Sequence, residues 1–168
     1  MTGKLVSVNV SRRRHVAKEP VAKAELRSGH GLVGDAHAGP GDRQVSLLAA
    51  ESIRTQARAF AENAAAGRPS SCPKARGPLG PGALTENLTT EGLDLSTLAA
   101  GTRLTVGSQV VLEVTQTGRE CFRYCEVFRR LGRCAMPRQT AFTRVVQGGV
   151  VRPDDTVQVR APDGCPGR

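Results

Sequence analysis

The alternation of apolar and polar residues along the chain predicts short β-strands near both ends of the sequence. Residues 5–11, LVSVNVS, place valines on one face and Ser7, Asn9 and Ser11 on the other, which is typical of a half-buried strand. Similar patterns predict strands at 21–26, 44–48, 103–106, 109–117, 141–147 and 156–160. Gly107 and Ser108 supply a hairpin turn between two of these strands. The chain is therefore predicted to be mainly β.

One long helix interrupts this pattern. Residues 49–66 are rich in alanine and carry Ile53, Ala57 and Phe60 at helical spacing. A second, short helix is predicted at 121–131. The stretch 67–82 is dominated by proline and glycine, so we expect a mobile surface loop inside a single domain of residues 1–168. Short strands, few helices and glycine-rich corners together indicate an α+β chain folded as a compact closed β-barrel.

The charge of the chain points to an anionic partner. The net charge is +9 and the isoelectric point is about 10.2. With no Trp, one Tyr and four Phe, the chain is poorly equipped to stack nucleic-acid bases, so a nucleic acid is not the expected partner. A small ligand with several negative charges explains the basic composition equally well, and so does a basic surface without a specific partner.

The five cysteines and the absence of long apolar runs bear on location. The N-terminal residues have no apolar signal region, and no eighteen apolar residues occur together. We therefore expect a cytoplasmic protein with no membrane association. In a reducing compartment the thiols are free, metal-bound or catalytic rather than paired in disulfides.

Three of the cysteines lie in one arginine-rich stretch, TGRECFRYCEVFRRLGRC, at residues 117–134. Cys121 lies between Arg119 and Arg123 at the predicted start of a helix, and both features favour the thiolate. Such surroundings lower a cysteine pKa from about 8.5 to roughly 3.5–7.5. Cys125 and Cys134 fit either core packing or a role as auxiliary thiols. The spacing of the three matches no common zinc site.

Two polar segments complete the candidate chemistry. In residues 31–39, Asp35 can orient His37, although both residue types also form ordinary turns. In residues 82–94, hydrogen-bonding side chains gather between two glycines, which suits a polar heterocycle but also loop capping. These side chains are Glu86, Asn87, Thr89 and Thr90. Motifs of NTPases, dinucleotide-binding enzymes and serine hydrolases are absent from the sequence.

In this order, the segments resemble the MOSC family, named for the C-terminal domain of molybdenum cofactor sulfurases. The resemblance covers nearly the whole chain apart from residues 61–80. It rests on GxxGDxHxG at 31–39, RxVSLL at 43–48, PGxxxENLTTxGLDL at 81–95, G-[KR]-x-C at 118–121, C-[VA]-MPR at 134–138 and GGxVRPxD at 148–155. Two positions depart from the family pattern. Thr85 stands where such sequences often carry a small residue such as glycine, and Asp154 replaces the glycine of a Gly-Asp turn.

The resemblance implies a closed barrel that binds the molybdenum cofactor, an anionic molybdopterin. It assigns Cys121 as a persulfide carrier or a molybdenum ligand. The residues expected around the cofactor are His37, Arg43, Glu86, Asn87, Thr89 and Arg119. The implied activity is sulfur transfer, with a cysteine desulfurase or another sulfur donor as partner, or reduction of N-hydroxylated compounds, with an electron-donor protein as partner.

Two other functions fit the same residues. The barrel could act as a lyase or transferase on a different sulfur compound. It could also be a non-catalytic module that binds polyanions through its arginines, in which case binding would depend steeply on salt and not on Cys121.

Overall fold

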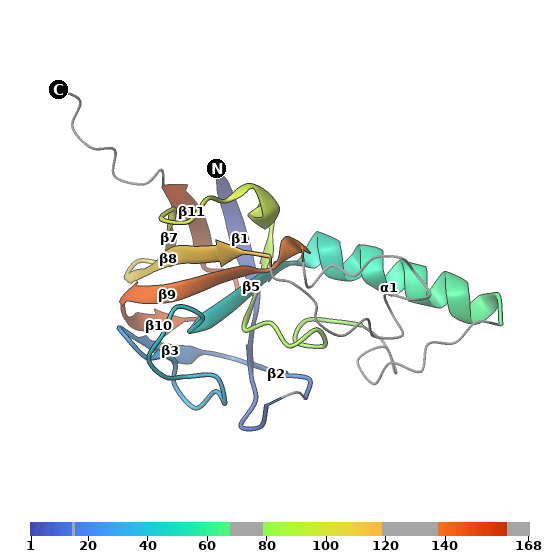
Figure 1. Ribbon diagram of the computed structural model, residues 1–168, viewed down its shortest axis with the longest axis horizontal. Coiled ribbons are helices and arrows are strands. Elements are labelled where there is room, and N and C mark those ends of the chain that lie inside the picture. Colours follow the sequence, from blue (N-terminus) through green and yellow to red (C-terminus); the bar gives the residue numbers. More distant parts are fainter. Residues whose placement is uncertain (15, 68–78, 119–137, 161–168) are drawn as a thin grey trace.

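The computed structural model describes residues 1–14, 16–67, 79–118 and 138–160, and Figure 1 shows their arrangement. The strands are β1 Thr2–Val10, β2 Glu19–Val21, β3 Ala24–Arg27, β4 Gly31–Leu32, β5 Val45–Ala49, β6 Leu88–Glu91, β7 Arg103–Val106, β8 Val110–Thr117, β9 Ala141–Gln147, β10 Gly149–Val151 and β11 Thr156–Arg160. The helices are α1 Ala50–Ala65 and the short 3-10 helix η2 Leu95–Thr97. The chain is therefore mainly β, as predicted.

Seven strands close into a barrel in the order β11-β7-β8-β9-β5-β6-β1. Closure comes from antiparallel pairing of β11 with the start of β1, where Thr2 lies opposite Gln158. The other end of β1 pairs with β2, and β5 and β6 run parallel. The strands β10, β3 and β4 form a second, smaller sheet. This architecture confirms the closed barrel.

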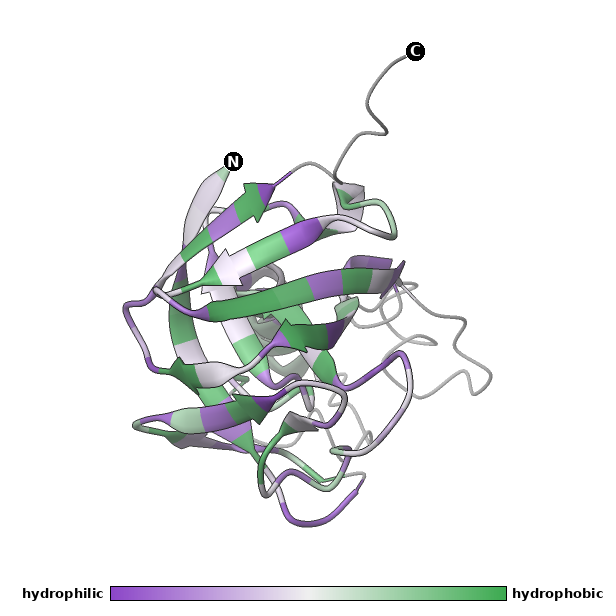
Figure 2. Ribbon diagram, turned by 90° about the vertical axis from the view of Figure 1, so that its left-hand side faces the viewer, coloured by the Kyte–Doolittle hydropathy of each residue, from purple (hydrophilic) through white to green (hydrophobic). Residues whose placement is uncertain are grey.

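The inside of the barrel is filled with aliphatic side chains. Leu5, Leu47, Leu88, Leu104 and Leu112 are fully buried and belong to one cluster. Figure 2 shows the hydrophobic residues concentrated on the strands, whereas several connections are hydrophilic. Burial of apolar surface stabilises by roughly 25 cal/mol per Å², so this cluster is the main source of stability.

On the other side of the barrel wall, β5 packs against α1. Val45 and Leu47 face the barrel interior, so Leu48 points outward, where it contacts Ile53 of the helix and Leu84. Figure 1 shows the rest of α1 extending away from the barrel. The helix predicted at 49–66 is confirmed to within one residue at each end.

The predicted faces of the first strand need a correction. A bulge between Leu5 and Ser7 gives β1 one extra residue relative to β6, so Leu5 and Val8 both face the barrel interior. Ser7 and Asn9 lie on the outer face as expected, but they are buried, with 6 % and 0 % exposure. The strand is therefore covered on both faces rather than half-buried.

Other predicted boundaries also change. The strand expected at 21–26 is divided between β2 and β3, which belong to different sheets. Strand β6 lies in the polar segment 82–94, to which no strand was assigned from the sequence. The helix predicted at 121–131 and most of the loop predicted at 67–82 lie outside the described residues. In the described part of the chain, no helix is both long and apolar enough to cross a membrane.

Candidate functional site

A row of polar side chains crosses the outer face of the barrel where β5 and β6 lie side by side. Ser46 donates from its backbone N–H and its hydroxyl to Asn87 Oδ1, at 3.2 and 3.0 Å. The amide of Asn87 also reaches the backbone oxygen of Asn9, with an Nδ2 to O distance of 3.4 Å. Asn87 is thereby held by three hydrogen bonds to two residues, and just before β6 it joins β5 to β1.

A second chain of hydrogen bonds connects Ser7 to Glu86. Ser7 Oγ donates to Asn9 Oδ1 at 2.7 Å, and Asn9 Nδ2 donates to Thr89 Oγ1 at 3.1 Å. Thr89 Oγ1 donates in turn to Glu86 Oε1 at 2.8 Å, which also accepts the backbone N–H of Gly82 at 2.5 Å. The loop before β6 is therefore fastened to the outer face of β1 by polar groups that are all buried.

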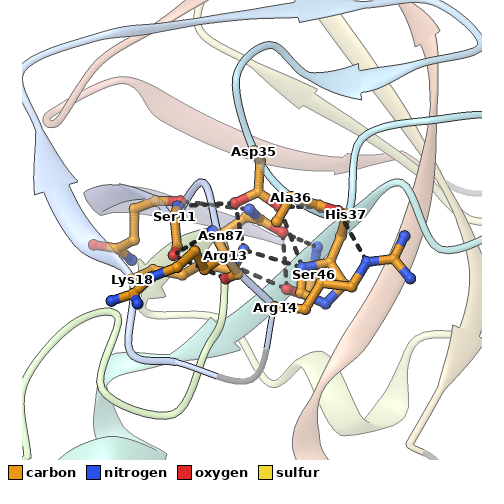
Figure 3. A network of polar contacts seen from close by, with 10 residues as sticks. Ser11, Arg13, Arg14, Lys18, Asp35, Ala36, His37, Ser46 and Asn87 are labelled. Carbon is orange, nitrogen blue, oxygen red and sulfur yellow. Dashed lines mark hydrogen bonds and ion pairs between the residues drawn. The ribbon is translucent and has the colours of Figure 1, made fainter.

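Beside these side chains lies a charged cluster of Lys18, Asp35 and His37, shown in Figure 3. Lys18 and Asp35 form a buried ion pair, with side-chain exposures of 2 % and 0 %. Asp35 also accepts the backbone N–H groups of Ser11 at 3.1 Å and His37 at 3.0 Å. His37 Nδ1 lies 3.5 Å from Lys18 Nζ and 3.4 Å from Asp35 Oδ2, and 41 % of its side chain is exposed. The cluster thus ends in an imidazole at the surface.

The surroundings lower the pKa values of Asp35 and His37. Burial alone would raise the pKa of Asp35, but hydrogen bonds from Lys18 and from the backbone of His37 and Ser11 outweigh it. Asp35 is therefore an anion at neutral pH. For His37, partial burial and the charge of Lys18 lower the pKa, although Asp35 opposes them. The imidazole is consequently neutral at physiological pH.

The pKa of Glu86 is shifted in the opposite direction. Burial raises the pKa of its carboxyl group, and the hydrogen bonds from Gly82 and Thr89 reduce that effect without cancelling it. Its second oxygen, Oε2, is buried and has no hydrogen-bond partner. The described residues thus contain two buried carboxyl groups, and only Asp35 has a cationic partner among them.

Arg43 lies at the other end of the polar row. Its guanidinium group lies over the ring of Phe142, 5.2 Å from the centroid, and donates from Nε and Nη2 to Gln116 Oε1 at 3.1 and 2.7 Å. Phe142 pairs with Ser46 on one side and with Gln116 on the other, so Arg43 belongs to the same face of the barrel as Asn87. The arginine is exposed, and its charge is available to an anion.

Gly118 and Thr140, which lie on either side of residues 119–137, are hydrogen-bonded to each other near Arg43. Gly118 donates its N–H to the Thr140 oxygen at 2.8 Å, and its own oxygen accepts from Gln116 Nε2 at 2.7 Å. Residues 119–137 themselves are not among the described residues, so the predictions for Arg119, Cys121, Cys125 and Cys134 stay predictions.

The remaining predicted site residues divide into two groups. Glu86, Asn87 and Thr89 lie together and are buried, and their hydrogen bonds are made mostly within the protein. His37 and Arg43 are exposed beside them. We therefore regard the buried group as the support of the site and the exposed group as its surface, and Glu86 Oε2 is the one polar side-chain atom of the buried group without a hydrogen-bond partner in the described residues.

Sequence reasoning missed Lys18. Its backbone N–H donates to the Gly82 oxygen at 3.0 Å, while its ammonium group pairs with Asp35. Lys18 thus joins the 31–39 and 82–94 segments, although it belongs to neither. An isolated lysine in a polar connection carries no signal of burial, so only the tertiary structure identifies it.

The donor chemistry suits an anionic, polar ligand better than a bare metal ion. The described residues include no group of three or more His, Cys, Asp or Glu side chains placed to hold a metal. They do offer the exposed charge of Arg43, the neutral imidazole of His37 and the unpartnered Oε2 of Glu86. These groups fit the pterin and phosphate parts of a molybdopterin.

A cleft of about 380 Å³ lies elsewhere, at the start of α1. It is lined by Glu51 and Ser52 of the helix, by residues 92–96 and by Gln139. None of the predicted site residues lines it, so the cleft is separate from the polar row.

A closed barrel with this outer polar face defines the class of protein. The model of the MOSC domain family matches residues 33–158, and the chain therefore belongs to the MOSC domain family. Among curated proteins, none matches the sequence.

Solved structures agree with this fold. YuaD from Bacillus subtilis is similar with a TM-score of 0.70 and 19 % sequence identity, over 95 % of this chain and 96 % of that one. YiiM from Escherichia coli is similar with a TM-score of 0.62 and 20 % identity, over 96 % of this chain and 70 % of that one. At such low identity the likeness concerns the fold alone.

Proposed function

We propose that this protein binds the molybdenum cofactor on the outer face of its barrel, with Cys121 as the reactive thiolate of the site. The proposal is carried by one observation: Lys18 connects the 31–39 segment to the 82–94 segment, beside the polar row that ends at Arg43. Segments far apart in the sequence thus supply one surface that presents the charge of Arg43 and the imidazole of His37.

The electrostatics of this surface favour an anionic ligand. Arg43 is exposed and fixed by Phe142 and Gln116, so little of its side-chain freedom remains to be lost on binding. At an effective dielectric constant of about 20, an arginine about 4 Å from a phosphate oxygen contributes roughly 4 kcal/mol of Coulomb attraction before desolvation. One or two such contacts are enough to favour a phosphorylated, dithiolate-bearing pterin over a neutral molecule.

The position of Cys121 in the sequence supports its role. It is the third residue after Gly118, and three residues span at most about 11 Å. Gly118 is held by Gln116, the residue that also binds Arg43. The length of the chain therefore allows the thiol to reach the cationic end of the polar row, where a positive charge would stabilise the thiolate.

In the sulfur-transfer version, the Cys121 thiolate attacks the outer sulfur of a donor persulfide, such as that of a cysteine desulfurase. A new S–S bond forms on Cys121, the donor S–S bond breaks, and the donor leaves as a thiolate, so no electrons are needed from outside. In the reductase version, the bound cofactor supplies two-electron chemistry and a separate protein supplies the electrons. Both versions need the same binding surface.

The test of the thiol uses the purified protein and an inorganic polysulfide as sulfur donor. Intact-mass spectrometry of the wild type should show one added sulfur, which peptide mapping places on Cys121. Cys121→Ser should lose this addition, whereas Cys72→Ser and Cys165→Ser should keep it. Equal loading of the Cys121→Ser variant would contradict the assignment.

A further inference from the structure

Glu86 differs from Asp35, the other buried carboxyl group of the site, in its interaction partners. Asp35 has an ammonium partner and two backbone N–H donors, but no ion pair to Glu86 occurs within the described residues. Glu86 is nevertheless fully buried. A buried carboxylate without a cation costs so much free energy that the group usually takes up a proton instead.

The directions of the surrounding hydrogen bonds locate that proton. Asn9 Oδ1 accepts the Ser7 hydroxyl, so the Asn9 group facing Thr89 is its NH₂ donor. Thr89 Oγ1 accepts from that NH₂, and its own hydrogen therefore points to Glu86 Oε1. With the Gly82 N–H, Oε1 receives two hydrogens. The carboxyl proton consequently belongs on Oε2.

Oε2 is the atom without a partner. Buried polar atoms that make no hydrogen bond are rare in folded proteins, and each calls for a physical explanation. An O–H group at this position is a hydrogen-bond donor that lacks an acceptor. Because Glu86 is adjacent to Asn87 in the polar row, an acceptor atom of a bound ligand is the simplest partner.

We propose that Glu86 is kept as a neutral carboxylic acid and that its Oε2–H is a donor reserved for an acceptor oxygen, nitrogen or sulfur of the ligand. Glu86 would then determine specificity, because it favours ligands that bring an acceptor and adds no negative charge next to an anion. The ligand part of this proposal rests on the proposed function, whereas the protonation of Glu86 is a property of the protein alone.

The first experiment addresses protonation in protein without ligand. Carbon-13 NMR of protein labelled at the glutamate side-chain carboxyl groups follows each group through a pH titration. The Glu86 signal, identified by its loss in Glu86→Gln, should keep the position of a protonated acid at pH 7. A Glu86 signal that titrates together with the exposed glutamates would overturn the proposal, whatever the ligand is.

The second experiment compares two substitutions by the pterin that copurifies with each. Glu86→Gln keeps an acceptor at the Oε1 position and a donor at the other, so its pterin content should stay within about twofold of the wild type. Glu86→Met has a similar length but removes the donor together with the acceptor of the Gly82 and Thr89 hydrogen bonds, and its pterin content should fall about tenfold or more. Equal pterin content in both variants would overturn the ligand role of Glu86.

The two experiments separate this proposal from the proposed function. If the wild type carries no pterin, cofactor binding fails, and the NMR titration still decides the state of Glu86. If Glu86→Met does not fold, as judged by its thermal unfolding, the comparison of Glu86→Gln with the wild type remains. A tenfold loss of pterin in folded Glu86→Gln would contradict the donor role, because the amide replaces the acid in shape and in hydrogen bonding.

Discussion

At the scale of single residues, the site holds two carboxyl groups whose surroundings push their pKa values in opposite directions. For Asp35, Lys18 and two backbone N–H groups outweigh burial and lower the pKa, whereas for Glu86 burial outweighs the surrounding hydrogen bonds and raises the pKa. Two carboxyl groups whose pKa values are pushed apart can take different roles in a site, one as a fixed negative charge and the other as a source of a proton or a hydrogen-bond donor.

This contrast predicts opposite dependences of stability on pH. The pKa of Glu86 is raised by folding, so its contribution to stability is complete below the ordinary glutamate pKa of about 4.3 and is lost as the pH rises through the folded value. Glu86→Gln should therefore match the wild type near pH 4 and become relatively more stable as the pH rises. Urea unfolding at several pH values measures the difference.

Asp35→Asn is the matched control for this experiment. The pKa of Asp35 is lowered by folding, so its contribution is present above the ordinary aspartate pKa and is lost as the pH falls. The variant should be less stable than the wild type at pH 7, and the gap should narrow in acid. Parallel pH profiles for the two variants would contradict the assigned charge states.

A strained backbone position offers a second prediction at this scale. Thr85 has φ +71°, in the left-handed region that suits glycine, at the position where the family pattern often carries glycine. Such strain in a β-branched residue costs of the order of 1–3 kcal/mol. Glycine removes the strain but loses more conformational entropy on folding, which offsets part of the gain in stability. Thr85→Gly should therefore stabilise the protein by about 1 kcal/mol in urea unfolding. Ala83→Gly, in the same loop, should not stabilise it.

At the scale of elements, Lys18 joins two connections of the chain. It lies between β1 and β2, pairs with Asp35 between β4 and β5, and bonds through its backbone to the loop before β6. The ion pair is buried, so removing one partner leaves an uncompensated charge. The arrangement of the exposed His37 depends on both partners being present.

Lys18→Met should accordingly lower the free energy of unfolding by about 3–5 kcal/mol. The double variant Lys18→Met with Asp35→Asn should lose less of this free energy than Lys18→Met alone. The double variant removes both charges together, so no buried charge remains unpaired. Chemical unfolding of the wild type, the two single variants and the double variant measures the coupling. Strict additivity of the two substitutions would show that the ion pair makes no specific contribution.

The sequence predicted most elements because most follow simple patterns. The strand at 141–147 and the strand at 156–160 are found with the predicted bounds, and α1 differs by one residue at each end. Strand β6 was missed because its buried outer residue is a threonine, Thr89, which contacts Asn9 rather than an apolar neighbour. The alternation of β1 was predicted correctly from Ser7 onwards and wrongly before it, because a bulge between Leu5 and Ser7, which depends on the partner strand, changes it there.

The candidate site could be predicted only in part. Glu86, Asn87 and Thr89 were recognised as a group since they are close in sequence and polar. Their burial depends on Ser7 and Asn9, about eighty positions earlier in the chain, and on Lys18. Contacts of such long separation leave no trace in a local pattern.

At the scale of the whole molecule, closure of the barrel depends on its last strand. β11 pairs with β1 on one side and with β7 on the other, and its Val157 is fully buried in the interior. A chain that ends at Asp155 should lack closure and leave two strand edges unpaired. We expect this truncated chain to lose cooperative thermal unfolding and to aggregate, in contrast to the full chain. Cooperative unfolding of a soluble truncated chain, followed by circular dichroism, would contradict this view of the barrel.

The central claim concerns the ligand of the polar row. The most direct test is the molybdenum and pterin content of the protein, purified under low oxygen from a host that makes the molybdenum cofactor. We predict molybdenum and pterin in comparable amounts in the wild type. Arg43→Ala should lower the content of both because it removes the exposed charge of the row, whereas Arg58→Ala, on the exposed face of α1, should retain the wild-type content. Wild-type protein that contains neither molybdenum nor pterin would contradict the account.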